Sequence, residues 1–323
     1  MKQLLMILSF ITIIQVFHVQ AYDFVVGKGD NDDFKTVQDA IDAVPDFRKN
    51  RTTIFIRRGI YKEKLVLSPS KRRVSLIGED VQNTILTYDD YNKKENRFGE
   101  TLGTTGSSSF FIFGEDFTAE NITFENSSGP VGPAVAVRIE SDKVAFKNCR
   151  FLGFQDTMYL KGRGGRQYYR NCYIEGTVDF IFGNSTAVFD QCTIFCKNKG
   201  YVSAPSTEQN TEFGFVFLNC NITGDAAEKS FYLGRPWRPY GKSVFIGCKL
   251  GNHIKLEGWN NWRDPAREKT AYFAEYNNTG EGAKPSQRVK WSLQLTSDQI
   301  QKYTVDHILG EWVNELAMFR KIN

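Results

Sequence analysis

The chain has 323 residues, and 41% of them are hydrophobic, which is enough to bury a sizeable core in one large or two ordinary domains. The formal net charge at pH 7 is +4, and the sequence has no clustered run of lysine and arginine of the kind that nucleic-acid binders show. We therefore expect no nucleic-acid partner, whereas the slight positive excess is compatible with a polyanionic ligand.

The first 21 residues predict a secretory signal peptide. Lys2 precedes an apolar run, and the short side chains at Val19 and Ala21 are typical of a cleavage site. A membrane anchor is the alternative, but the run is short for a bilayer span of about 20 residues. We expect residues 1–21 to be removed and residues 22–323 to form a single exported domain with no membrane partner. The protein would be extracellular, or periplasmic in a Gram-negative bacterium.

Short helices are predicted near both ends of the mature chain. Thr36 begins a sequence that resembles a capping box, and residues 37–44 carry apolar side chains at helical spacing until Pro45 interrupts them. Near the C-terminus, Thr296 or Ser297 is a suitable N-cap for a second helix.

Five of the six cysteines recur within nearly the same short phrase. The phrases are FKNCRF around Cys149, YRNCYI around Cys172, FDQCTI around Cys192, FLNCNI around Cys220 and FIGCKL around Cys248. Ile122 occupies the cysteine position of an earlier phrase, AENITF, and the intervals between these positions run from 20 to 28 residues. Recurrence at this interval is typical of a solenoid whose coils return to the same place.

Each phrase alternates apolar and polar side chains and is followed by a turn residue, which predicts a short strand. Strands that recur in this way stack as a parallel β-helix with coils about 4.8 Å apart. We therefore predict an all-β solenoid, with the short terminal helices covering its open ends. The repeated cysteines would form an internal ladder of buried thiols, although disulfide bonds are the alternative in an exported protein. Cys196 lies outside this ladder.

Two common kinds of hydrolytic site are not expected in this chain. His253 and His307 are the histidines of the predicted mature chain, and neither lies near a G-x-S-x-G motif, so a Ser-His-Asp triad is improbable. The sequence has no HExxH motif and no paired CxxC motif, so we expect no metal site. Chemistry would therefore use carboxylates, arginine and amides.

Two aspartates are the first candidates for that chemistry. Asp179 interrupts the apolar residues 177–183, and strand alternation with Phe180 and Phe182 pointing inward would place Asp179 on the outer wall. Asp156 lies 23 residues earlier, which equals one cysteine interval, so the two backbones should lie within about 5 Å on adjacent coils. Stacked like charges repel by about 3 to 4 kcal/mol at an effective dielectric constant of 20, so structure alone would not favour the pair. A solvated aspartate remains the alternative for either residue taken singly.

Arg235 lies between a glycine and a proline, which restrain the backbone that presents its guanidinium. An arginine can keep one aspartate ionised through a bidentate contact while a second aspartate retains its proton. A tight turn with a surface ion pair is the alternative. Trp237, Trp259 and Trp262 offer flat apolar faces for sugar rings, although tryptophans are more often part of the core.

Several of these segments together resemble pectin methylesterases. Residues 153–159 (GFQDTMY), 178–183 (VDFIFG) and 233–237 (LGRPW) are similar to the three central motifs of that family, in the same order. The similarity extends to GIYKE at residues 59–63 and to GWNNW and AEYNNTGEGA near the end, so it covers nearly all of the mature chain.

The resemblance implies a right-handed parallel β-helix that hydrolyses methyl esters of homogalacturonan without a cofactor. Asp179 would be the nucleophile, Asp156 the general acid and then the general base, and Gln155 an oxyanion donor. Arg235 would orient Asp179 and keep it ionised. We expect a monomer whose partner is methyl-esterified pectin, contacted by Trp237, Phe180, Tyr159 and Trp259.

One position departs from the family pattern. Where a second oxyanion glutamine is expected, in a QAVA segment, this chain has Pro133, which offers neither a side-chain donor nor a backbone N–H. Losing one oxyanion donor costs about 2.7 to 4 kcal/mol of transition-state stabilisation. Activity is therefore expected to be lower unless Gln155 or a neighbouring backbone amide compensates.

Two other functions stay open at the level of sequence. A pectate lyase or a galacturonan hydrolase could use the same solenoid, but the chain lacks an acidic cluster for catalytic calcium and the hydrolase family's paired-aspartate and GHG segments. A pectin-binding protein with impaired turnover is the non-enzymatic alternative, and Pro133 is its motivation.

Overall fold

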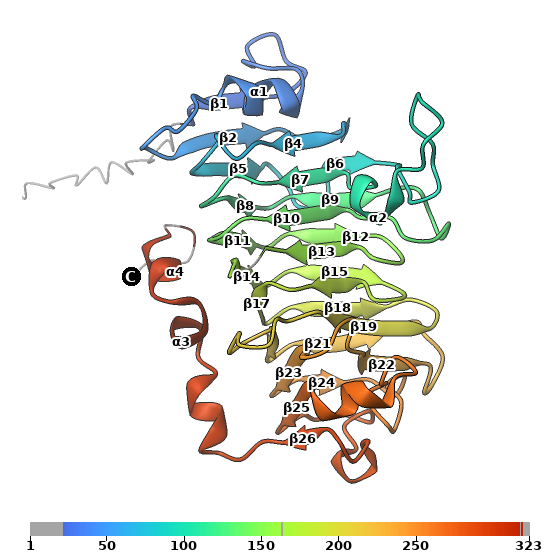
Figure 1. Ribbon diagram of the computed structural model, residues 1–323. Helices are drawn as coiled ribbons and strands as arrows, with labels where there is room; N and C mark the ends of the chain where they lie inside the picture. Colours follow the sequence, from blue (N-terminus) through green and yellow to red (C-terminus); the bar gives the residue numbers. More distant parts are fainter. Residues whose placement is uncertain (1–21, 163, 317, 319–323) are drawn as a thin grey trace, which may run out of the picture.

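The computed structural model describes residues 22–162, 164–316 and 318, so the predicted signal peptide lies outside the described residues. The described chain winds into a long stack of coils, and each coil adds strands to the sheets that run along the stack (Figure 1). Neighbouring strands within a sheet pair in parallel. The predicted parallel β-helix is confirmed. None of the described helices is long and apolar enough to cross a membrane.

The strands of the described residues form three sheets. The eleven-stranded sheet contains β1 (Phe24–Val26), β2 (Thr52–Ile56), β5 (Val74–Gly78), β8 (Thr118–Glu120), β11 (Val144–Lys147), β14 (Arg166–Arg170), β17 (Thr186–Asp190), β20 (Phe215–Leu218), β23 (Lys242–Ile246), β25 (Tyr272–Tyr276) and β26 (Leu293–Gln294). The eight-stranded sheet contains β3 (Gly59–Lys62), β6 (Thr84–Tyr88), β9 (Thr123–Asn126), β12 (Arg150–Leu152), β15 (Tyr173–Gly176), β18 (Thr193–Cys196), β21 (Asn221–Gly224) and β24 (Lys249–Leu250). The seven-stranded sheet contains β4 (Leu65–Leu67), β7 (Phe110–Ile112), β10 (Val137–Glu140), β13 (Met158–Lys161), β16 (Ile181–Gly183), β19 (Gly200–Pro205) and β22 (Phe231–Gly234).

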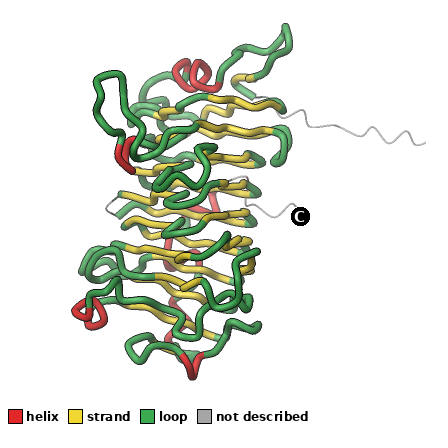
Figure 2. The backbone as a smooth tube through the Cα atoms, turned by 90° about the vertical axis from the view of Figure 1, so that its right-hand side faces the viewer, coloured by secondary structure: helices red, strands yellow, loops and turns green. Residues whose placement is uncertain are grey.

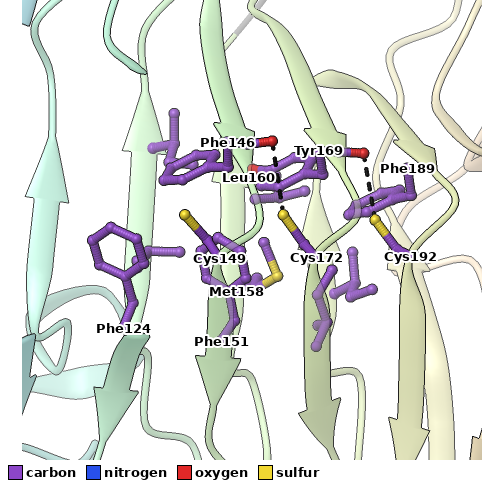
Figure 3. Close-up of a cluster of buried hydrophobic side chains, with 14 of the residues drawn as sticks. Phe124, Phe146, Cys149, Phe151, Met158, Leu160, Tyr169, Cys172, Phe189 and Cys192 are labelled. Carbon is purple, nitrogen blue, oxygen red and sulfur yellow. Dashed lines mark hydrogen bonds between the residues drawn. The ribbon is translucent and has the colours of Figure 1, made fainter. Parts of the chain in front are cut away.

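The repeated cysteines form the internal ladder that their spacing predicts. All six cysteines are buried and free, and the five repeated ones lie one per coil. The Cys172 thiol donates a hydrogen bond to the carbonyl of Phe146 on the preceding coil, and Cys192 does the same to Tyr169 (Figure 3). Disulfides are therefore not part of the fold.

Aromatic rings stack beside the sulfur ladder. Figure 3 shows the rings of Phe146, Tyr169 and Phe189 in a row, with centroid distances of 5.2 Å for the first pair and 4.8 Å for the second. The row continues from Phe189 to Phe217 at 4.6 Å. Such stacked pairs contribute about 0.5 to 1.5 kcal/mol each beyond the burial of their area. The repeat therefore aligns one coil on the next through identical interior contacts.

The residue before each repeated cysteine makes the corner between two sheets. Asn148, Asn171, Gln191 and Asn219 have positive φ angles between 50° and 54°, and Gly247, which precedes Cys248, has a φ of 63°. Asparagine tolerates this left-handed conformation better than most residues because its short side chain bonds locally. The asparagine of the repeated phrase therefore has a conformational role.

The N-terminal end of the stack is covered by α1 (Val37–Ala43). Thr36 caps this helix by accepting a hydrogen bond from the backbone N–H of Asp39 at 3.2 Å, as predicted. Val37, Ala40 and Ile41 are buried against the first coils.

The C-terminal segment lies elsewhere than expected. Thr296 precedes a 3₁₀ helix, η3 (Gln299–Lys302), and is followed by α3 (Val305–Leu309) and α4 (Trp312–Glu315). These elements run along the outer face of the eleven-stranded sheet instead of covering the last coil (Figure 1). The reason is that this sheet exposes outward-facing apolar residues, which α3 and α4 bury: Ala145, Tyr168, Val188, Val216 and Val244.

The remaining short helices lie in loops. The 3₁₀ helices η1 (Pro265–Lys269) and η2 (Pro285–Gln287) belong to the last coils. The single-turn helix α2 (Gly103–Gly106) follows a loop that projects from the stack (Figures 1 and 2). This loop brings α2 beside the seven-stranded sheet, where the candidate site lies.

Candidate active site

Asp156 and Asp179 lie at equivalent places on adjacent coils of the seven-stranded sheet. Each precedes its strand by two residues, since Met158 of β13 pairs with Ile181 of β16. The backbone N–H of Asp156 donates to the carbonyl of Val178, the residue before Asp179, at 3.1 Å. Both aspartates have positive φ, 66° and 53°, so each is a corner residue that turns its side chain out of the strand pattern.

Arg235 joins Asp179 from the end of β22. Its Nε donates to Oδ1 of Asp179 at 2.9 Å and its Nη2 donates to Oδ2 at 2.7 Å. The guanidinium lies between two aromatic rings, 3.8 Å from the centroid of Tyr201 and 3.7 Å from that of Trp262. The two ring contacts and the two hydrogen bonds leave the guanidinium little freedom to move. The carboxylate of Asp179 is therefore fixed in orientation.

The two carboxyl groups differ in charge environment. Asp156 is 9% exposed and Asp179 is 6% exposed, so burial raises the pKa of both. The negative charge of Asp179 raises the pKa of Asp156 further, well above its ordinary value. The hydrogen bonds and charge of Arg235 oppose the rise in the pKa of Asp179. Asp156 is therefore the carboxyl that holds a proton when Asp179 is ionised.

The two aspartates open into a cavity of about 290 Å³. Gln155, Tyr159, Phe182, Trp237 and Trp262 are among its lining residues. The rings of Tyr159 and Phe182 stack at 4.4 Å between centroids, and Trp237 meets both edge-on. The cavity therefore combines a charged floor with an apolar aromatic wall.

A second cavity of about 480 Å³ continues from the first one. Tyr159 and Trp237 line both, so the two form one cleft along the outer wall of the solenoid. Lys161 and Arg238 contribute positive charge to this second part, and Glu208 contributes one negative charge. An elongated cleft with an excess of positive charge in this part suits an extended acidic chain.

The structure does not bring two of the expected substrate contacts to the cleft. Phe180 is fully buried inside the solenoid, and Trp259 is 1% exposed and packs against Phe273. Phe182, expected to point inward, lines the cleft instead. The reason is the corner at Asp179. After this corner Phe180 and Ile181 both face the interior, so the alternation of inward and outward side chains is shifted by one residue and Phe182 faces outward.

The sequence did not predict some of the residues that line the cavity, and it left the role of others open. Trp262 was named only as a possible aromatic face, and its position over Arg235 depends on a loop contact that no local pattern encodes. Thr104 and Thr105 come from α2, about fifty residues before Asp156, and carry no motif. Gln155 lines the cavity as expected, whereas Pro133 is not among its lining residues.

The fold and the cleft together define the class of this protein. It is a parallel β-helix protein that presents two aspartates and an arginine in a cleft on its outer wall. Residues 23–311 match the pectinesterase family, and the chain belongs to that family of carboxylic ester hydrolases.

Known relatives agree with this assignment. The chain is 43% identical to Pectinesterase 31 from Arabidopsis thaliana over 280 residues, which is 85% of this chain and 88% of that protein. It superposes on the pectin methylesterase from carrot with a TM-score of 0.85 and 33% identity, covering 94% of this chain and 98% of that one. A pectin methylesterase solved in complex with a hexasaccharide gives a TM-score of 0.80 and 30% identity, covering 90% and 98% of the two chains.

Proposed function

We propose that the protein hydrolyses the methyl esters of homogalacturonan, releasing methanol, with Asp179 as the nucleophile. The observation that carries this proposal is the asymmetry of the two aspartates. Arg235 donates two hydrogen bonds to Asp179, while Asp156 on the preceding coil is buried and has a raised pKa. An ionised carboxyl can act as the nucleophile and a protonated carboxyl as the proton donor, so this pair can cleave an ester through an acyl-enzyme.

In the first half of the reaction, a carboxylate oxygen of Asp179 attacks the ester carbonyl carbon and forms a mixed anhydride. The bond to the methoxy group breaks, and Asp156 gives its proton to the departing methanol. The buried position of Asp156 supports this role, because burial keeps the carboxyl protonated until the leaving group needs the proton.

In the second half, Asp156 is ionised and takes a proton from water, whose oxygen attacks the anhydride. Asp179 leaves as a carboxylate, the galacturonate acid is released, and Asp156 is again protonated. Arg235 stabilises the returning negative charge of Asp179 through its two hydrogen bonds. Gln155 donates to the carbonyl oxygen as negative charge develops on it.

The substrate chain would lie in the cleft formed by the two cavities. Tyr159, Phe182 and Trp237 offer apolar surface to sugar rings, and Lys161 and Arg238 offer charge to free carboxylates. Because pectin belongs to the cell wall, we propose that residues 22–323 act outside the cell. We also propose that they form one domain and act as a monomer.

A pectin-binding protein with impaired turnover is the second candidate, and Pro133 is the specific observation that favours it. The proline supplies no donor where the family pattern has an amide. Retained binding of the polymer without methanol release would be its signature.

The test is methanol release from highly methylated pectin, with polymer length followed in parallel. Methanol release without shortening of the chain supports the esterase, whereas shortening or unsaturated ends would support a hydrolase or a lyase. Asp179→Asn keeps the shape of the side chain and is expected to abolish release. Wild-type protein that binds pectin but releases no methanol would overturn the proposal in favour of the binding protein.

A further inference from the structure

An arginine that the mechanism above does not use contacts the turn that presents Arg235. Arg267 belongs to η1, and its side chain is 15% exposed. Its Nη1 donates to the carbonyl of Pro236 at 2.6 Å and to that of Trp237 at 3.1 Å, and these are the two residues directly after Arg235. Arg267 is not among the lining residues of either cavity of the cleft, so it contacts the backbone of the site and not the bound substrate.

Arg267 completes the hydrogen bonds of this turn. The backbone N–H groups of Arg235 and Trp237 donate to carbonyls of β19, at 3.0 and 2.9 Å. Pro236 has no N–H, so β19 receives no bond from the middle of the turn. The carbonyls of Pro236 and Trp237 accept from Arg267 instead. The strand therefore holds the N–H groups of the turn, and Arg267 holds its carbonyls.

Arg267 also contacts the ring that stacks on Arg235. The guanidinium carbons of Arg235 and Arg267 lie 3.7 and 5.7 Å from the ring centroid of Trp262. Trp262 has a φ of 61°, a left-handed conformation that a bulky residue keeps only where surrounding contacts enforce it. Its N–H donates to Oδ1 of Asn260 at 2.9 Å. The place of the Trp262 ring over Arg235 thus depends on contacts of its own loop, and Arg267 makes one of them.

The side chain of Arg267 is itself held in place. Its Nε donates to Oδ2 of Asp264 at 3.1 Å, and the other carboxylate oxygen of Asp264 accepts from the N–H of Ala266 at 3.1 Å. The planar guanidinium presents its donors at fixed angles, so Arg267 can bridge Asp264 and two carbonyls at once. It therefore ties η1 to the turn that follows Arg235.

We infer that Arg267 is a positioning residue of this site, which acts through the turn of Arg235 and Trp237 and through the ring of Trp262. Held in this way, Arg235 reaches both carboxylate oxygens of Asp179, and Trp237 lines the cleft. Arg267 contacts no reacting group and transfers no proton. The inference rests on the proposed esterase function, since its test reads the ionisation of Asp179 through methanol release.

The test compares the pH profile of kcat/KM, and the KM for pectin, of wild type and Arg267→Ala. The acid limb is expected to move to higher pH by at least about half a pH unit, because a displaced Arg235 stabilises ionised Asp179 less. The KM is expected to rise about threefold or more, because Trp237 belongs to the same turn. A change in both quantities from one substitution outside the cleft is the signature of the positioning role.

Arg263→Ala is the matched control. Arg263 is an exposed arginine of the same loop, and its substitution removes the same positive charge from this part of the surface. Screening by salt should keep its acid limb within about 0.2 pH units of wild type and its KM within about twofold. Equal changes in Arg263→Ala and Arg267→Ala would overturn the inference, because they would show an effect of net charge alone.

Arg267→Gln gives a second reading. The amide keeps one neutral donor for the carbonyls and loses the guanidinium, so both changes are expected in the same direction and at smaller size. Thermal unfolding of each variant shows whether it is folded, and Arg267→Gln decides the matter if Arg267→Ala does not fold. A lower Tm with an unmoved acid limb and an unchanged KM would also overturn the inference, because Arg267 would then serve stability only.

These outcomes separate the two proposals. Folded wild type that releases no methanol would remove the esterase function itself. Wild-type release that Asp179→Asn abolishes, with profiles unaltered by substitution of Arg267, would leave the esterase standing and remove only the role of Arg267.

Discussion

Both carboxylate oxygens of Asp179 accept hydrogen bonds from Arg235, at 2.9 and 2.7 Å, and the guanidinium is clamped between aromatic rings. Asp156, one coil away, has the same burial without such a contact among the described residues. This difference gives the two aspartate side chains different pKa values, and it can be tested through the pH dependence of activity and stability.

Arg235→Lys is expected to move the acid limb of the pH profile of kcat/KM to higher pH. In the proposed mechanism activity requires Asp179 ionised and Asp156 protonated, so the expected profile is bell-shaped, with its acid limb dominated by Asp179. Arginine lowers the pKa of Asp179, and a lysine without the bidentate contact lowers it less. Profiles of wild type and variant check the shift, and an unmoved acid limb would contradict the role of Arg235.

Asp156→Asn is expected to be more stable than wild type at alkaline pH. The pKa of Asp156 is raised in the folded state, so its contribution to stability is present at low pH and is lost as pH rises through the folded pKa. The free energy of unfolding, measured by denaturation across pH, should therefore favour the variant increasingly as pH rises toward the folded pKa. The advantage should vanish below about pH 4, and an advantage that is constant with pH would refute the assignment.

The thiols of the internal ladder are expected to be free but unreactive in the folded protein. Burial raises the pKa of the Cys149 thiol to about 12, and all six cysteines are buried. Alkylation followed by mass spectrometry should add nothing to the native protein and six adducts in denaturant without reductant. Fewer than six adducts would reveal disulfide bonds.

Trp237→Ala is expected to raise KM for pectin about tenfold with a smaller effect on kcat, because Trp237 lines both cavities and, among the described residues, no hydrogen bond joins it to the aspartates. Phe98→Ala is the matched control, since Phe98 is an aromatic residue 72% exposed on the projecting loop outside the cleft. Equal effects of the two substitutions would argue against a substrate-binding cleft at Trp237.

The repeated phrase was sufficient to predict the solenoid. A parallel β-helix is built from contacts between equivalent positions one coil apart, so the interval between Cys149, Cys172 and Cys192 carries the stacking register directly. The same register aligns Asp156 with Asp179, since both lie two residues before paired positions. The N-terminal helix followed from Thr36 because capping is a local interaction.

Local patterns failed where a corner or a long-range contact decides the outcome. Alternation predicted that Phe182 points inward, but the left-handed conformation of Asp179 shifts the alternation by one residue. Trp259 and Trp262 lie in one short segment, yet Trp259 is buried in the core and Trp262 stacks on Arg235. The C-terminal helix was expected to cover the open end of the last coil. Instead, the C-terminal helices pack on the outer face of the eleven-stranded sheet and bury its apolar residues.

The sequence by itself determined the coil, its interior ladder and the pairing of the two aspartates, because each depends on a spacing that repeats along the chain. The residues alone left open which aspartate Arg235 binds, and the family resemblance implied Asp179; the tertiary structure shows that contact and also decides which residues line the cavity with Gln155. Asp179 and Arg235 are 56 positions apart in the sequence, and α2 comes from a loop that precedes both. Contacts over such separations depend on how the loops pack against the coils, which no local pattern in the sequence encodes.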